Sequence, residues 1–391
     1  MAEVRHILEG EKMRPSRFLA TAVITTATLI TTAGPASAAP APTAPRDVGT
    51  LGGDWSNPTA LSDSGYLVGS SQTATGETHA FRWRAGHLTD LGVLPGGGAS
   101  HAVDVNERGD VAGTAVTRTG TARPFLWRHG VMRDLTAVTG DAISVTGLND
   151  AGRVIGTRYT ATSGQYGQAF VWRDGVATDL PGLGGDTLAD DINNRGEIAG
   201  STVSADGAET EAALWRGGKL IRLTPPVGIA SMAVDVNERG QVVGTVRVPD
   251  SGWHAFLWEN GVFTDLGALG GTESYPVGIN DRGQIGGNAG DNANLRAVRW
   301  HRGTATDLAA LSGVTGLATA MNGAGSVAGV ADLGGSRGVV WRGASAVDLG
   351  PLDRGVTGGS VQFINDRGLV AGTIAVTGTG SHAVVWDLGR P

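Results

Sequence analysis

The sequence predicts an all-β fold: an eight-bladed β-propeller with four-stranded antiparallel blades of about 43 residues. Three observations predict this class. Tryptophans recur at steps of 41 to 45 residues, G-x-x-x-G pairs keep the same step, and each period holds four short apolar runs between turn residues. Repeats of this length are typical of propeller blades, which bury both faces by stacking round a ring. The repeat tryptophans are Trp83, Trp127, Trp172, Trp215, Trp258, Trp300, Trp341 and Trp386.

Each unit contains the turn chemistry that a four-stranded meander needs. Between the first and second runs stands Asn-x-x-Gly, as from Asn106 to Gly109, which is typical of a type I turn. Between the third and fourth runs stands a pair such as Asn260-Gly261, which supplies the positive φ angles of a primed hairpin. Tight turns should therefore gather at one end of the blades and variable loops at the other. In the fifth unit, strands of three to six residues are expected at 234–236, 242–244, 255–258 and 262–266.

Residues 1–38 have the features of a signal peptide. Basic residues precede an apolar stretch that ends in small residues, cleavage is expected after Ala38 or the next alanine, and translation can start at Met13. Residues 39–45 are a short linker, and 46–391 form a single propeller domain that the N-terminal strand closes by completing the last blade. We therefore expect a secreted protein with no membrane span and no lipid or C-terminal anchor.

The composition excludes several classes of protein. With 64 glycines, 40% hydrophobic residues and no Gly-X-Y period, the chain is not helical, collagen-like or disordered. It has no cysteine, which removes disulfide frameworks and thiolate metal sites. A net charge of −7 gives no electrostatic reason to bind nucleic acid or an anionic membrane. We expect a monomer without cofactor or metal, whose partner is an extracellular or cell-envelope glycan or protein.

The repeat motif resembles a known family. Residues 254–258 read H-A-F-L-W, residues 79–83 read H-A-F-R-W, and residues 265–271 read D-L-G-A-L-G-G. With the G-x-x-x-G pairs, this pattern is similar to the HAF-repeat family of extracellular, propeller-like repeat proteins, over essentially all of 46–389. The resemblance implies export and a propeller-like array, and it brings no substrate. Phe is absent from the fourth, sixth, seventh and eighth units, and His is replaced by Arg123, Gln168, Glu211, Arg296 and Arg337.

The repeated polar residues are interpreted as structural. His79, His254 and His382 lie on different units, so they cannot converge on one metal ion. The runs 191–196 and 235–240 begin like calcium loops, but each carries arginine at a ligand position, which favours hairpin turns. The aspartate before leucine in most units should cap a turn, because catalysis needs a unique constellation. The repeat tryptophans should lie in the core.

The candidate site therefore consists of aromatic residues outside the repeat pattern, in or beside the variable loops. Exposed rings there could stack on a sugar or anchor a peptide. This interpretation predicts an exported, non-catalytic binding module for a carbohydrate or a protein, and not an enzyme. Two alternatives are an extracellular propeller enzyme acting on polysaccharide, a lyase or glycosidase, and a structural envelope protein. The candidate ligand-binding residues are Trp55, Tyr159, Tyr166, Trp253 and Tyr275, with Asp54, Arg158, Asp250, His254 and Glu273 nearby in sequence.

Overall fold

In the part of the chain that the computed structural model describes, the elements are β-strands and one short helix, α2 (Leu308–Ser312), so the all-β class is confirmed. All described residues belong to the unit Ala39–Pro391, and the expected signal peptide lies outside them. Within them, no helix is both long enough and apolar enough to cross a bilayer. The described residues are 44–135, 142–159, 167–291, 294–352, 359–376, 378 and 380–389.

The strands repeat in sets of four, one set per sequence unit. The first strands are β2 (Gly52–Leu61), β6 (Gly97–Val105), β10 (Ala142–Leu148), β14 (Gly184–Ile192), β18 (Ala230–Val236), β22 (Glu273–Ile279), β26 (Gly316–Met321) and β30 (Ser360–Ile364). The second strands are β3 (Leu67–Thr73), β7 (Val111–Thr117), β11 (Val154–Tyr159), β15 (Ile198–Ser204), β19 (Val242–Arg247), β23 (Gln284–Gly290), β27 (Val327–Asp332) and β31 (Leu369–Ala375). The third strands are β4 (Thr78–Arg84), β8 (Ala122–Arg128), β12 (Gly167–Arg173), β16 (Thr210–Arg216), β20 (Trp253–Glu259), β24 (Arg296–His301), β28 (Ser336–Arg342) and β32 (Ser381–Asp387). The fourth strands are β5 (His87–Asp90), β9 (Val131–Asp134), β13 (Val176–Asp179), β17 (Lys219–Arg222), β21 (Val262–Asp265), β25 (Thr304–Asp307), β29 (Ser345–Pro351) and, for the eighth unit, β1 (Arg46–Asp47).

The described strands form seven hydrogen-bonded sheets, where the sequence predicted eight separate blades. Six sheets have four strands, and the seventh has eight because β16 and β18 pair at one position, Thr210 with Ala230. Within each unit the pairing is antiparallel, as expected. Many strands are longer than the sequence suggested, and β2 reaches 10 residues.

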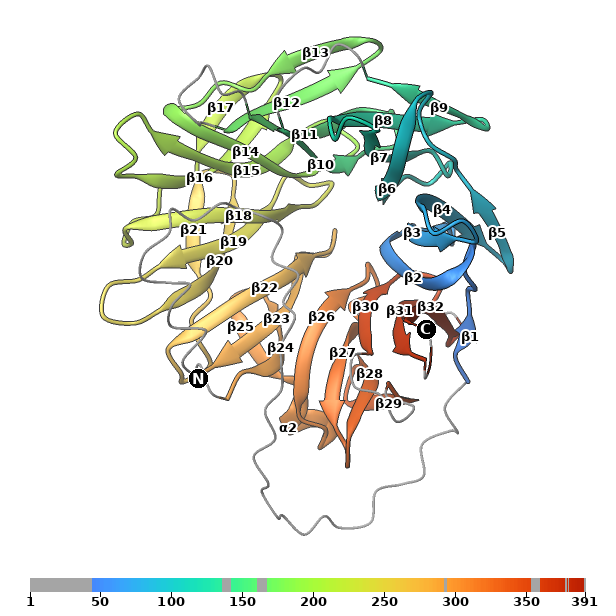
Figure 1. Cartoon of the computed structure of the whole chain (residues 1–391). Coiled ribbons are helices and arrows are strands. Elements are labelled where there is room, and N and C mark those ends of the chain that lie inside the picture. The colour runs from blue at the N-terminus through green and yellow to red at the C-terminus, as the bar shows by residue number, and fades with distance from the viewer. Residues whose placement is uncertain are drawn as a thin grey trace. The chain divides into compact units, whose positions relative to one another are not determined.

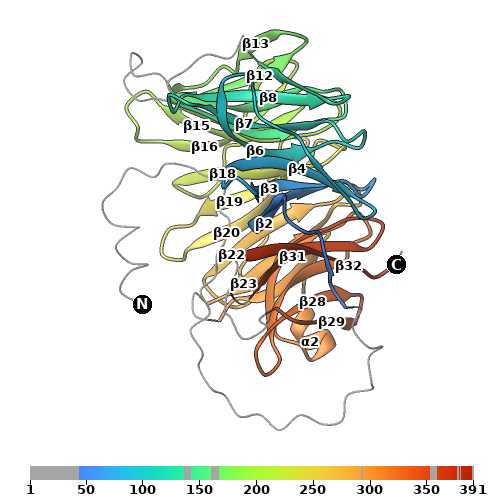
Figure 2. The ribbon, with the colours of Figure 1, turned by 45° about the vertical axis from the view of Figure 1, so that its right-hand side comes forward.

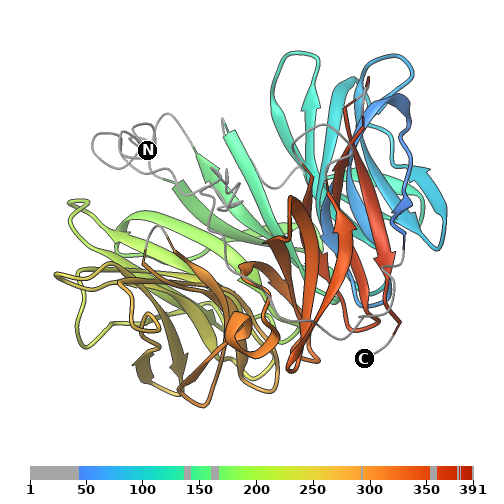
Figure 3. The same ribbon diagram turned by 90° about the horizontal axis from the view of Figure 1, so that it is seen from below.

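The first strand of each unit packs against the first strands of its neighbours, and β30 packs beside β2. The first strands therefore lie innermost and the fourth strands outermost. Figures 1 and 3 show the C-terminal units in red beside the N-terminal units in blue. β1 pairs with β32 through Arg46 with Val385 and Asp47 with Val384.

The tight turns have the expected geometry. The amide of Gly240 donates to the carbonyl of Asn237 at 3.0 Å, which closes the turn between the first and second strands. Asn260 and Gly261 both have positive φ, 51° and 87°, as a primed hairpin requires. We call the end of the sheets with these turns the turn face, and the opposite end, with the longer connections, the loop face.

Helix α2 was not expected from the sequence. It lies in the connection between the sixth and seventh units and contacts β24 and β29. Figure 2 shows it beside β29. The carboxylate of Asp307 accepts from the amide of Ala310 as an N-cap, and Gly313 ends the helix at φ 72°.

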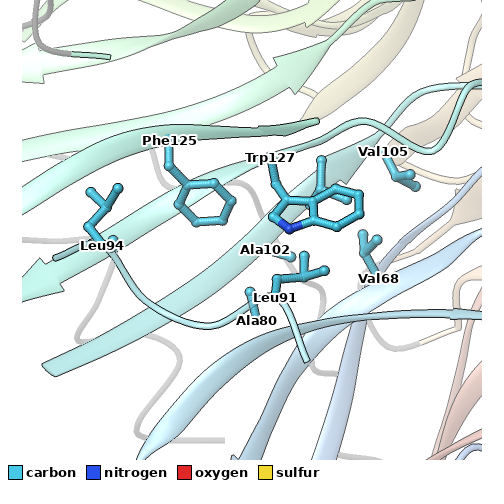
Figure 4. Packing of buried hydrophobic residues seen from close by; sticks show 10 residues of the cluster. Val68, Ala80, Leu91, Leu94, Ala102, Val105, Phe125 and Trp127 are labelled. Atoms are coloured by element: carbon cyan, nitrogen blue, oxygen red, sulfur yellow. The ribbon is translucent and has the colours of Figure 1, made fainter. Parts of the chain in front are cut away.

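The repeat tryptophans pack differently in units with and without the motif phenylalanine, because one of the two rings must cover the strand glycine. In the second unit, the Phe125 ring covers the strand glycine Gly113, and a Cβ added to this glycine would lie 2.7 Å from the ring. Figure 4 shows Phe125 and Trp127 in one buried cluster with Val68 of the first unit. In the fourth unit, which lacks the phenylalanine, the Trp215 ring covers the equivalent glycine. The four units without phenylalanine share a further bond, in which tryptophan Nε1 donates to a backbone carbonyl: Trp215 to Pro181, Trp300 to Leu266, Trp341 to Val314 and Trp386 to Leu349.

A belt of buried asparagines joins the units near the turn face. Asn149 Nδ2 donates to the carbonyl of Asn193 in the next unit at 3.0 Å, and most neighbouring units repeat this bond. The belt also spans the first and last units, because Asn365 Nδ2 donates to the carbonyl of Ser62 at 2.9 Å. The other bonds run from Asn106 to Asn149, Asn193 to Asn237, Asn237 to Asn280, Asn280 to Gly323 and Asn322 to Asn365.

Candidate binding site at the loop face

The repeated histidines form cross-strand pairs with the repeated aspartates. His254 Nδ1 lies 2.9 Å from the carboxylate of Asp265, which also accepts from the amide of Gly267 at 2.8 Å. The predicted turn-capping role of this aspartate is confirmed. Five units share this pairing of a basic residue on the third strand with an aspartate on the fourth: His79 with Asp90, His254 with Asp265, Arg296 with Asp307, Arg337 with Asp348, and His382 with Asp47.

The fourth unit carries the same pair with the charges exchanged. Glu211 stands at the histidine position and Arg222 at the aspartate position, and the two form an ion pair. In the third unit, where the histidine position holds a glutamine, Arg158 on the second strand pairs with Asp179 instead, at 2.6 Å. The departures in the third, fourth, sixth and seventh units therefore keep an ion pair and change only the residues that supply it. In the second unit, no ion pair of the described residues joins Arg123 to Asp134, and one carboxylate oxygen of Asp134 is buried without a partner.

A pair of carboxyl groups joins the innermost strands of the fourth and fifth units. Asp191 accepts from the amide of Val236 at 3.0 Å, and Asp235 accepts from the amide of Ile279 in the sixth unit at 2.8 Å. Burial and the neighbouring Asp191 raise the pKa of Asp235 well above its ordinary value. These carboxyls connect adjacent strands, which agrees with the interpretation of both runs as turns. Across the described ranges, no group of three or more His, Cys, Asp or Glu side chains is placed to hold a metal ion.

The structure places four of the five predicted site residues at the loop face. Trp55 lies in β2, Tyr159 at the end of β11, Trp253 at the start of β20 and Tyr275 in β22, all partly buried. Tyr166 lies outside the described residues. Trp55 and Tyr159 belong to the first and third units, whereas Trp253 and Tyr275 lie on neighbouring units whose strands β20 and β22 pack together.

Trp253 and Tyr275 form a cluster with two charged residues. Arg247 pairs with Trp253 in the register of β19 and β20, and its guanidinium carbon lies 6.0 Å from the centre of the indole ring. A Cβ on Gly252 would lie 2.7 Å from the Glu273 side chain, so the loop of the fifth unit touches the sixth. We call Arg247, Trp253, Glu273 and Tyr275 the loop-face cluster. The sequence did not indicate Arg247, because only the pairing of β19 with β20 places it opposite Trp253.

The charges of this cluster keep the Tyr275 phenol protonated. Burial, and then the Glu273 carboxylate, raise the pKa of Tyr275 above its ordinary value, while Arg247 opposes them. The phenol therefore serves as a hydrogen-bond donor and not as a base. The cluster combines two aromatic rings, a guanidinium and a carboxylate, which can together contact apolar side chains and polar backbone groups of a ligand.

A serine lies next to the cluster and extends the His254–Asp265 pair. Ser251 Oγ lies 2.9 Å from His254 Nε2 and donates at 3.3 Å to the carbonyl of Thr272. Hydroxyl, imidazole and carboxylate therefore stand in the order that nucleophilic hydrolases use. However, the first unit has the same histidine–aspartate pair without a serine. Strand pairing thus accounts for the pair, and the geometry by itself assigns no catalysis.

Comparison with known proteins gives the fold class. No family model and no curated protein matches the chain. Among solved structures, a prolyl endopeptidase is similar with a TM-score of 0.54 and 10% identity, over 87% of this chain and 55% of that one. Dipeptidyl peptidase 4 of Porphyromonas gingivalis is similar with a TM-score of 0.52 and 11% identity, over 80% and 56%. The β-propeller domain of the Trilobed protease from Pyrococcus furiosus gives 0.46 and 8%, over 76% and 98%.

The repeated four-stranded sheets and the two similarities with TM-scores above 0.5 identify the chain as a β-propeller, and these similarities correct the functional prediction. At such low identity they show the fold alone, and the chain spans little more than half the length of the two larger peptidases. The prediction of a non-catalytic module for a glycan or a protein is contradicted, because the similar propellers come from peptidases. The two alternatives of that prediction, a polysaccharide lyase or glycosidase and a structural envelope protein, fall with it, because the similar structures are peptidases.

Proposed function

We propose that this chain is the propeller part of a peptidase system and presents polypeptide substrates at the loop-face cluster. The fold similarity supports the choice of class, and the cluster carries the proposal. Trp253 and Tyr275 are two partly buried rings on adjacent units, and Arg247 and Glu273 beside them offer both charges to a peptide. A polypeptide has apolar side chains, amides and charged groups, which this combination matches better than it matches a uniformly hydroxylated sugar.

The proposal includes a ring of eight blades closed by the N-terminal strand. We count the eight-stranded sheet as two blades, because a single residue pair joins β16 to β18. Closure is supported by bonds between the two ends of the chain. The Ser56 hydroxyl accepts from the amide of Ala383 at 3.0 Å, and the ion pair of His382 with Asp47 spans 2.8 Å.

The remaining features follow from the sequence. The chain is exported after removal of residues 1–38, its repeat belongs with the HAF repeats, and it acts as a monomer. The peptide bond is cleaved by another polypeptide, so this chain supplies substrate binding and no nucleophile. Such a division of labour accounts for a cluster of two aromatic rings and two charged residues at the junction of the fifth and sixth units.

The test is calorimetric titration of the full chain with neutral, proline-containing decapeptides that carry one aromatic residue. Trp253→Ala and Arg247→Gln should each weaken binding about tenfold, because a partly buried aromatic contact contributes about 1–2 kcal/mol and 1.4 kcal/mol is a factor of ten. Trp55→Ala is the matched control, since Trp55 is a partly buried loop-face tryptophan of another unit. Equal loss in all three variants, or loss in none, would refute the cluster as the binding site.

A second measurement separates binding from catalysis. The same decapeptides are incubated with the chain alone and analysed by mass spectrometry. The proposal expects intact peptides. Ser381→Ala is the control, because Ser381 stands next to the histidine of the eighth unit. Cleavage that disappears in Ser251→Ala and persists in Ser381→Ala would overturn the non-catalytic assignment and place the chemistry at the serine beside His254.

A further inference from the structure

The turn face carries a feature that the proposed function does not use, a hollow lined by arginines. Two adjoining cavities, of about 620 and 450 Å³, open between the third and fourth units and between the fourth and fifth. Both are lined by Arg195 and Gly217, so they meet at the fourth unit. Each volume falls within the range of small-ligand sites in proteins. The arginines of the two cavities are Arg153, Arg173, Arg195, Arg216 and Arg239.

The hairpin of the fourth unit, which borders both cavities, carries no side chain. Gly217 and Gly218 form the turn with φ of 58° and 77°, and a Cβ on either would have no heavy atom within 4 Å. The third and fifth units place Asp174 and Asn260 at the position of Gly217. We call the two cavities, which meet at Arg195 and Gly217, the arginine groove.

The groove keeps a positive charge although the whole chain is acidic. Five arginines face three carboxylates: Asp174 and Glu197 in the lining, and Glu259, which pairs with Arg239 at 3.2 Å. Glu197 is buried and pairs with Arg195 and Arg216, at 2.5 Å each. Burial alone would raise the pKa of Glu197, but hydrogen bonds from Asn193 and these two arginines lower it, so the carboxylate stays ionised.

The unneutralised charge lies at the third unit. Arg173 pairs only with the exposed Asp174 at 3.2 Å, and surface pairs of this kind are weak. The guanidinium of Arg153 lies against Gly196, and no ion pair joins it to any residue of the described part of the chain. Both can therefore bind an added anion without breaking a buried pair.

The groove also has apolar walls. Val171, Val176, Leu180 and Ile198 line the larger cavity, and Val176 is 63% exposed. The Trp215 ring also borders it but is only 1% exposed, so it does not offer a stacking platform for a sugar. Positive charge beside aliphatic side chains matches a polypeptide that alternates carboxylates with apolar residues, and matches an anionic polysaccharide less well.

We propose that the arginine groove is a second binding site, for an acidic segment of polypeptide that carries apolar side chains. It lies at the opposite end of the sheets from the loop-face cluster and does not depend on the function proposed for that cluster. Arg153 and Arg173 bind carboxylates of the segment, and Val176 contacts its apolar side chains.

The experiment measures fluorescence anisotropy of labelled decapeptides with the full chain. The probes are alternating glutamate–valine, alternating lysine–valine, and a labelled oligogalacturonate of equal charge. The first should bind, more weakly as salt rises, and the other two should not bind at the same concentration. Arg153→Gln with Arg173→Gln should weaken binding about tenfold, as expected for two exposed charge contacts of about 0.7 kcal/mol each.

Two matched variants complete the design. Arg302→Gln with Arg367→Gln removes the same charge from exposed turn-face arginines outside the groove and should leave binding unchanged. Gly217→Asn adds a side chain between the cavities that the left-handed backbone tolerates, as at Asn260 with φ of 51°, and should also weaken binding. The proposal would be overturned by any of three results. The first is an equal loss of peptide affinity in the Arg302 and Arg367 control, the second is unchanged affinity in the groove variants, and the third is equal binding of the oligogalacturonate.

Discussion

The asparagine belt gives a direct test of ring closure. Asn149 joins the third and fourth units, and Asn365 joins the last unit to the first. Both side chains are almost completely buried, with 3% and 2% exposure. If the ring is closed, Asn149→Ala and Asn365→Ala should destabilise the protein equally, because the last junction is then equivalent to any other.

The magnitude follows from the bonds that each side chain makes. Asn365 donates to the carbonyl of Ser62 at 2.9 Å and accepts from the amides of Arg367 and Leu369 at 3.0 and 2.9 Å. Alanine leaves a buried carbonyl without this donor, and such a group costs about 1–3 kcal/mol. We expect each variant to lose about 2 kcal/mol of unfolding free energy and about 4 °C in Tm.

Urea denaturation followed by tryptophan fluorescence measures this loss, and the double variant should lose the sum because the two sites are far apart. An Asn365→Ala variant that loses clearly less than the Asn149→Ala variant, which should lose about 2 kcal/mol, would refute closure. The last junction would then be open in solution, and the bond to Ser62 would contribute nothing to stability.

Three further predictions concern single repeats. Reversing one charge, by Glu211→Arg or Arg222→Asp, should lower Tm, and the double reversal should restore it because it recreates the pair of the other units. Gly244→Ala should cost about 3 kcal/mol, since its Cβ would lie 2.0 Å from the backbone oxygen of Met232 and 2.7 Å from the Phe256 ring. Gly261→Ala, in open space with φ of 87°, should cost about 1 kcal/mol of backbone strain. The pKa of Asp235 is raised in the folded state, so the folded protein binds this proton more tightly than the unfolded chain does. The contribution of Asp235 to stability should therefore fall as pH rises above about 4, and Asp235→Asn should remove that fall.

Each of these predictions has its own measurement. Thermal melts of the four charge combinations report the coupling, and a double variant no more stable than the singles would contradict it. Urea denaturation ranks the two glycine variants, and an equal cost would mean that the strand glycine is not in close contact. For Asp235, the unfolding free energies of the parent and of Asp235→Asn should diverge as pH rises from 4 to 8. Parallel curves of unfolding free energy against pH would exclude a raised pKa of Asp235.

The local pattern of the sequence was enough to predict the sheets. Turn residues such as Asn260-Gly261 act on their immediate neighbours, and apolar runs of period two specify strands wherever they stand. The positions of the four strands within each unit therefore needed no knowledge of the rest of the chain. Helix α2 was missed because a single turn of helix has too few residues to give a periodic signal.

The sequence by itself determined the repeat, the strands and the core, because each depends on a pattern that recurs in neighbouring residues. Only the tertiary structure decided which departures from that pattern matter. The exchange of Glu211 and Arg222, the approach of Arg247 to Trp253 and Tyr275, and the groove bordered by Gly217 all depend on contacts between strands or units. Such contacts join residues that are distant in the chain, so no local pattern records them.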